Sequence, residues 1–236
     1  QKLFIHALIQ NDVEHVKETF EHASVDDKVL LLSGKSEGHM QNDNHLSYLD
    51  SSVSLPLHLC VIYSSLDVCM FFIDQGIHAT QCDGKGNNAI HSLIEWAAIK
   101  KEDETRFACN YQCFMGLLSP ESRHELLMKE NSQGYRPLEL AAHMCCFQLM
   151  NSIFDTEGVY RIVSQSGFEE LHYFDVTDYE YFQGNTSPIR SRVSPIQLMA
   201  GMSKQVAEDS STRKYLLSEP IITWIKAKGH LNAPIV

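Results

Sequence analysis

One short pattern recurs along the chain and constrains its fold more than any other feature. Proline or alanine is followed by an aliphatic residue and then by histidine or glutamate, at residues 56–58, 89–91 and 137–139. The first two copies are 33 residues apart. A period of this length is typical of units built from two antiparallel helices, which cannot bury their apolar faces alone. The sequence therefore predicts helix pairs that stack side by side.

Local signals indicate where the helices of the clearest unit begin and end. Pro56 suits the first turn of a helix, where its missing N–H costs nothing, and Ser54 is placed to act as the N-cap. Gly76 is expected to close the second helix in a left-handed conformation. Residues 83–86 (DGKG) are typical of a tight turn, and we expect a hairpin-like finger there that leads to the next unit.

The period and the Pro-Leu-His core are those of the ankyrin repeat. We therefore predict a mainly α fold, an ankyrin-repeat solenoid of about four repeats, followed by a small β element and a closing C-terminal helix. Histidines 58 and 91 are expected to bond the backbone of a finger and so tie neighbouring units together. The predicted ankyrin region, residues 1–158, comprises a repeat at 2–20 that matches the consensus poorly and repeats near 54–87, 88–130 and 131–157.

The unit that begins at Asn88 is longer than its neighbours. Its core motif lies 48 residues before the next one, a surplus of 15 over the regular period. We place the surplus at residues 97–110, which include the charged run 100–104, and expect either a lengthened inner helix or a charged loop between the two helices. A second polar stretch, residues 33–52, is predicted to be a loop or insertion.

The pattern changes after residue 158. Residues 159–193 are predicted to form a strand-containing linker, with strands at 160–163 and 171–176 around a turn at 164–167. Residues 194–228 are expected to hold a final half-repeat and a helix that either caps the stack or couples it to a membrane. Residues 229–236 are predicted to be a tail.

Composition disfavours several classes of function. The net charge of −11 argues against binding to a phosphate backbone, so we expect no nucleic-acid partner. No nucleophile elbow and no phosphate-binding loop occurs, and we expect neither an enzyme nor a cofactor. No run of apolar residues is long enough for a membrane helix. The chain starts with Gln1, and we expect it to be a piece of a longer protein.

The cysteines are expected to be reduced thiols packed in a cytosolic protein. There are seven, with no spacing typical of a disulfide framework. A zinc site is disfavoured, because neighbouring residues of a helix point about 100° apart and rarely reach one ion together. The candidates for such a site were Cys109, Cys113, His143, Cys145 and Cys146.

The order of the motifs resembles one family. Residues 55–60 (LPLHLC) and 83–94 (DGKGNNAIHSLI) are similar to two late ankyrin repeats of the vanilloid-type transient receptor potential (TRP) channels, which also carry a long insertion in the next repeat. Residues 131–142 resemble the segment after that insertion, and residues 173–177 (YFDVT) resemble the strand that follows the last outer helix. The resemblance covers roughly residues 54–228. It implies a tetrameric, calcium-permeable channel whose membrane part lies outside this chain.

Two functions follow as hypotheses. The first is the cytosolic N-terminal assembly and regulatory domain of a TRP-like cation channel, at the cytoplasmic side of a membrane. Its partners would be neighbouring subunits of a homo- or hetero-tetramer and other regulatory proteins. The alternative is a cytoplasmic ankyrin scaffold or adaptor that binds another protein through its concave face. The residues predicted to contact a partner or subunit are Lys85, Asn87, Gln133, Tyr135, Tyr173, Phe174, Asp175 and Trp224.

Overall fold

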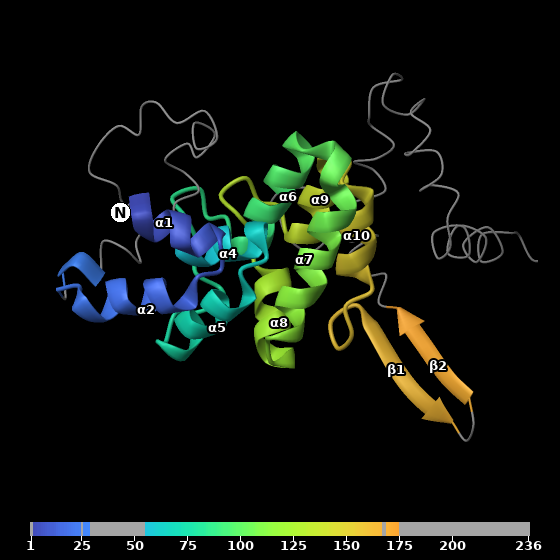
Figure 1. Ribbon diagram of the computed structural model, residues 1–236. Coiled ribbons are helices and arrows are strands. Elements are labelled where there is room, and N and C mark those ends of the chain that lie inside the picture. The colour runs from blue at the N-terminus through green and yellow to red at the C-terminus, as the bar shows by residue number, and fades with distance from the viewer. Residues whose placement is uncertain (1, 25, 29–54, 167–168, 175–236) are drawn as a thin grey trace, which may run out of the picture. The chain divides into compact units, whose positions relative to one another are not determined.

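The computed structural model describes residues 2–24, 26–28, 55–166 and 169–174, and these are mainly helical. Helices dominate the ribbon and a single hairpin follows them (Figure 1). The prediction of a mainly α fold is confirmed. Several predicted segments lie outside the described residues: the loop at 33–52, most of the linker after 174, the final half-repeat and closing helix at 194–228, and the tail at 229–236.

Helices occur in antiparallel pairs joined by short turns. The N-terminal pair, predicted at residues 2–20, is present as α1 (Lys2–Ile9) and α2 (Val13–His22). The next pair is α4 (Pro56–Tyr63) and α5 (Leu66–Asp74), and the last is α9 (Pro137–His143) and α10 (Phe147–Phe154).

The turn inside each of these three pairs has the same backbone geometry. Asn11, Ser64 and Cys145 all have positive φ, between 56° and 61°. The amide of the residue that follows each of them bonds a carbonyl five residues back, for example Ser65 N–H to the Cys60 oxygen at 2.8 Å. This is the Schellman arrangement, which satisfies carbonyls at the end of the first helix. The three pairs are therefore copies of one supersecondary unit.

The long unit contains three α-helices and a short 3₁₀ helix, where two helices were predicted. Its inner helix α6 (Ala89–Ile99) is followed by a short 3₁₀ helix, η1 (Lys101–Asp103), and by α7 (Glu104–Gly116) and α8 (Pro120–Met128). The inner helix is longer than α4, 11 residues against 8, but it ends at Ile99 and so holds only a small part of the surplus that was predicted at residues 97–110. The charged run forms the 3₁₀ helix and its flanking residues, and α8 was not predicted.

Neighbouring pairs stack through shared apolar faces. The first helices contact one another in succession, α1 with α4, α4 with α6, and α6 with α9, while α2 contacts α5 and α7 contacts α10. Figure 1 shows the pairs side by side in chain order. Leu57, Leu93 and Phe114 are completely buried between them. Burial of such side chains stabilises the stack by about 1.5–3 kcal/mol each.

Two predicted boundaries are wrong. Leu55 and not Ser54 occupies the N-cap of α4, and it makes no side-chain cap bond, because Pro56 already fills the first helical position. Residues 164–166, predicted to begin a turn, belong to strand β1 (Arg161–Ser166), which pairs antiparallel with β2 (Glu169–Phe174). β1 extends three residues beyond its predicted end, and β2 begins two residues before its predicted start, because the polar residues near the turn still join the backbone ladder.

No helix among the described residues is long and apolar enough to cross a bilayer.

Candidate functional site

Two finger turns, residues 83–87 and 131–135, have the same internal hydrogen bonds. In the first, Asp83 Oδ1 accepts from the amides of Lys85 and Asn87, both at 2.8 Å. In the second, Asn131 Oδ1 accepts from the amides of Gln133 and Tyr135, both at 3.0 Å. Short Asp and Asn side chains stabilise turns in this way because they reach backbone amides two to four residues on.

The two finger turns also bind each other. Ser132 N–H donates to the Lys85 carbonyl at 2.9 Å, and Asn131 Nδ2 donates to Asn87 Oδ1 at 3.0 Å. The approach is so close at Gly86, where φ is +72°, that a Cβ atom there would lie 2.9 Å from the Ser132 nitrogen. The finger turns of adjacent units therefore form one continuous ridge.

The predicted contact residues on the ridge differ in accessibility. Lys85 and Gln133 are exposed at the tips and free to meet a partner. Tyr135 is half-buried and its ring stacks on His143, with centroids 5.1 Å apart. Asn87 is 1% exposed, and its amide nitrogen donates to Glu95 Oε1, so its side chain holds the ridge together and is not available to a partner.

Two buried histidines bond backbone carbonyls outside their own helices: His91 bonds the ridge at Tyr135, as predicted, whereas His58 bonds Gln81, two residues before the ridge begins. His58 Nε2 lies 3.2 Å from the Gln81 carbonyl and donates to it, while Nδ1 lies 2.8 Å from Ser92 Oγ. His91 Nδ1 accepts from Asn88 N–H, so its Nε2 carries the proton and donates to the Tyr135 carbonyl at 2.9 Å. Burial lowers the pKa of each imidazole to about 4, and both are neutral at pH 7.

The β1–β2 hairpin presents an exposed apolar pair. Ile162 and Tyr173 are cross-strand partners, and they are 56% and 54% exposed. Side chains directly opposite each other on a sheet lie close enough to form a common surface. Tyr173 is thus exposed as a partner contact requires, whereas Ile162 was not anticipated. Residue 162 lies within the strand predicted at 160–163, but Val163 beside it is apolar too, so no alternation in the sequence showed which side chain faces outward.

The other predicted contact residues are less well defined. Phe174 ends β2 opposite Arg161, and its side chain is outside the described part of the structure. Asp175 and Trp224 lie outside the described residues altogether.

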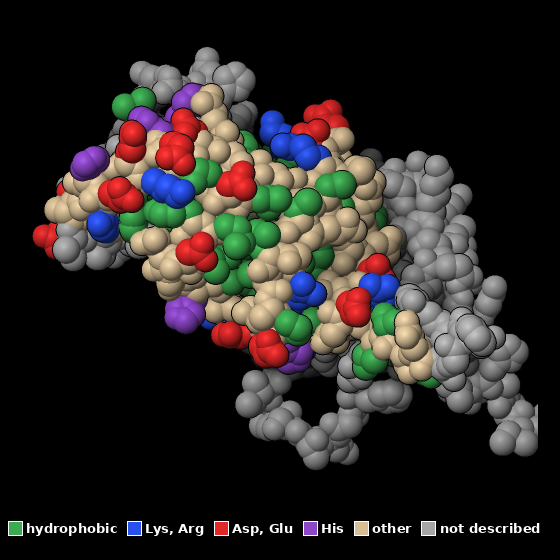
Figure 2. All heavy atoms as spheres, turned by 60° about the horizontal axis from the view of Figure 1, so that its bottom comes forward, with side chains coloured by type: hydrophobic (Ala, Val, Ile, Leu, Met, Phe, Trp, Pro, Cys, Tyr) green, Lys and Arg blue, Asp and Glu red, His purple; other side chains and the backbone are tan. Residues whose placement is uncertain are grey.

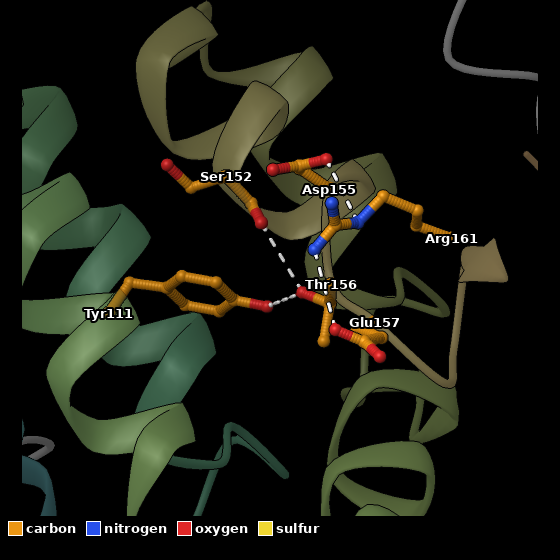
Figure 3. A network of polar contacts seen from close by, with 6 residues as sticks. All are labelled: Tyr111, Ser152, Asp155, Thr156, Glu157 and Arg161. Atoms are coloured by element: carbon orange, nitrogen blue, oxygen red, sulfur yellow. Dashed lines mark hydrogen bonds and ion pairs between the residues drawn. The ribbon is translucent and has the colours of Figure 1, made fainter. Parts of the chain in front are cut away.

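A polar junction fastens the hairpin to the last helix pair (Figure 3). Tyr111, from α7, lies 2.5 Å from Thr156 Oγ1, and Thr156 also donates to the Ser152 carbonyl at the end of α10. Arg161, the first residue of β1, pairs with Asp155 at 3.3 Å and with Glu157 at 3.6 Å. The strand therefore starts from a point that is held by two helices. Sequence reasoning missed the junction because Tyr111 is 45 residues away from Thr156 and no local motif marks the residues between Ser152 and Arg161.

The cysteines divide into two groups. Cys60, Cys69 and Cys146 are buried, which confirms the expectation of packed thiols. Cys109 and Cys113 are exposed on α7, so for them the expectation is wrong: they lie on a face of the helix that no other described element covers. Within the described residues no three His, Cys, Asp or Glu side chains converge as a structural zinc site would require.

The chain matches no known protein-family model, and no curated protein is similar to it.

Proposed function

We propose that the chain is an ankyrin-repeat stack that serves as the cytosolic N-terminal assembly and regulatory domain of a TRP-like, calcium-permeable cation channel. It acts through protein–protein contacts, and its partners are the neighbouring subunits of a tetramer. The resemblance of residues 54–228 to the vanilloid-type channels suggests the family. The 33-residue period and the matching finger turns support the repeat type.

The exposed pair Ile162 and Tyr173 is the observation that carries the proposal. More than half of each side chain is exposed, although both are large and apolar. Exposed apolar surface that is held on a rigid support is typical of a protein contact site. The support here is the junction of Arg161 with Asp155, which caps the C-terminus of α10, and with Glu157, so the start of the hairpin is tied to the end of that helix. This is what an assembly domain requires if contact with a neighbour is to affect the stack.

The opposite side of the contact would be the finger ridge of a neighbouring subunit. Its exposed tips, Lys85 and Gln133, offer a cation and an amide, which can bond the backbone edges of a hairpin. The ridge is rigid because its turns bond each other, so binding orders few side chains and costs little entropy.

Site-specific cross-linking tests the proposal in the assembled full-length protein. A photoreactive amino acid at position 173 should link two subunits, and the linked peptide should include residues 83–87 or 131–135. The same group at Met70, which is 39% exposed on α5, is the matched control and should give no link to those residues. Links from position 173 that stay within one chain would contradict the subunit contact and favour an adaptor that binds through its concave face.

A further inference from the structure

The uncovered face of α7 carries two free thiols. Cys109 and Cys113 are exposed, whereas every other cysteine of the chain is buried or half-buried. Cysteine is among the residue types most often found inside proteins, because its thiol behaves as a small apolar group. Two exposed cysteines one helical turn apart therefore call for a reason other than packing.

Their spacing does not suit a disulfide. Residues four apart on a helix lie on one face with Cβ atoms about 5–6 Å apart, whereas a disulfide needs about 3.5–4.5 Å. The intact helix therefore keeps the two sulfurs from bonding each other. A metal ion between them fits better, because two metal–sulfur bonds of about 2.3 Å span up to roughly 4.6 Å.

We propose that Cys109 and Cys113 form a two-thiolate site for a soft monovalent metal ion, copper(I). Thiolates select soft ions such as copper(I) and zinc. A structural zinc ion takes four protein ligands, and the described residues offer no group of three or more. Copper(I) is satisfied by two sulfurs on opposite sides. The thiols lose their protons as the ion binds, and no electron is transferred.

The helix that bears the thiols is held firmly from its other side. Phe107, Tyr111 and Phe114 are buried beneath it. Asn110, between the two cysteines, donates from Nδ2 to the Ile62 carbonyl at 2.8 Å. The two thiols therefore keep their spacing before the ion arrives, and a site on such a rigid element loses little entropy on binding.

Competition for copper(I) tests the site in the intact, reduced chain without oxygen. The protein is titrated into the coloured complex of copper(I) with bicinchoninate, and the loss of colour gives the stoichiometry and affinity. We expect one ion per chain. Cys109→Ser and Cys113→Ser should each weaken binding about a hundredfold or more, because the second sulfur binds intramolecularly. Cys82→Ser, which alters a half-buried thiol elsewhere, is the control and should leave binding unchanged.

X-ray absorption at the copper edge gives a second readout. Two sulfur neighbours are expected in the unaltered chain. Equal thermal unfolding curves of the variants show that the substitutions did not disturb the fold, since both positions are exposed. The site is refuted if each single variant keeps the original affinity, if Cys82→Ser is as damaging as the other two, or if the chain removes no copper from the chelator.

Discussion

Gly86 lies where the two finger turns come closest to each other. Its φ of +72° is one that residues with a side chain rarely adopt, and an added Cβ would meet the backbone of Ser132 at 2.9 Å. Gly76 has a similar φ of +87°, but nothing lies within 4 Å of the position of its Cβ. Substitution of Gly76 therefore measures the free-energy cost of the left-handed backbone alone, whereas substitution of Gly86 adds the cost of pushing the two finger turns apart.

Gly76→Ala should therefore destabilise the chain by about 1 kcal/mol, the penalty for a left-handed alanine. Gly86→Ala should cost about 2–4 kcal/mol, because the finger turns must also separate and lose the bond from Ser132 to Lys85. Urea unfolding of each variant measures the difference. Equal losses for both would show that the ridge is not tightly packed.

Ser64 and Asn11 share a left-handed backbone but not the use of their side chains. Ser64→Gly relieves the strain and should raise the free energy of unfolding by about 0.5–1 kcal/mol. Asn11→Gly should have the opposite sign, because Asn11 donates to Asp67 at 2.8 Å and accepts from Val68 N–H. Chemical denaturation gives both values, and a stabilising Asn11→Gly would disprove the role of its amide.

The helix pairs could be predicted from the sequence because local residues mark where their helices begin. Pro56 and Pro137 mark first turns, and Asn88 caps α6 by accepting from the Ile90 and His91 amides. Helix α8 was not predicted, although Ser119 is an N-cap and Pro120 occupies the first helical position. A repeat of two helices leaves no room for a third, so these signals were not read as a helix start. The position of α8 depends on a distant contact, from Asn88 Nδ2 to the Leu126 carbonyl, which no local pattern reveals.

The candidate site could be predicted only where its hydrogen bonds join residues that are close in the sequence. The finger turns show in the sequence through Asp83, Asn131 and their glycines. The burial of Asn87 depends on its partners Glu95 and Asn131, one on α6 and the other in the next turn, so its burial could not be foreseen. The same holds for the junction of Tyr111 with Thr156, which are 45 residues apart.

The inner helices and the finger ridge should respond together to acid. The pKa of His58 and His91 falls from 6.5 to about 4 on folding, chiefly by desolvation. Below pH 6.5 the unfolded chain takes up protons that the folded chain does not. Stability contributed by the neutral imidazoles is thus complete above pH 6.5 and is lost as the pH falls to 4, by about 1.4 kcal/mol per pH unit for each histidine.

Unfolding free energies measured between pH 6.5 and 4 test this dependence. His58→Asn and His91→Asn should each make the slope shallower, whatever they do to stability at pH 7. His124→Asn is the control, because His124 is exposed on α8. Unchanged slopes in both buried variants would rule out the two imidazoles as the source of the acid response.

The junction decides whether the hairpin moves with the helices. Tyr111→Phe removes the bond to Thr156 and should cost about 1–2 kcal/mol, the usual loss for a buried hydrogen bond. Hydrogen exchange should speed up in β1 and at the end of α10 but not in α1, because the lost bond holds only the hairpin end. Faster exchange throughout the chain would mean that Tyr111 supports the whole core.

In the described stack, the residues that stabilise the fold are largely different from those proposed to contact a neighbouring subunit. The interior of the stack consists mainly of apolar side chains shared between helix pairs, and it includes the ridge residues Asn87 and Asn131. The β1–β2 hairpin follows α10 and is attached through the ion pairs of Arg161, while its apolar pair Ile162 and Tyr173 stays exposed. Changes to the outer face of the hairpin should therefore affect assembly and leave folding intact.

The double substitution Ile162→Ser and Tyr173→Ser tests this separation. The thermal unfolding midpoint should change by no more than a few degrees, because both side chains are more than half exposed. Assembly of the full-length protein should weaken by about tenfold or more, since only about half of each side chain is left to be buried against a neighbour, which is worth roughly 0.8–1.5 kcal/mol each. Met70→Ser on α5 is the control for loss of an exposed apolar side chain. Sedimentation of the detergent-solubilised protein measures the assembly state, and a tetramer as stable as the original would exclude this face of the hairpin from the interface.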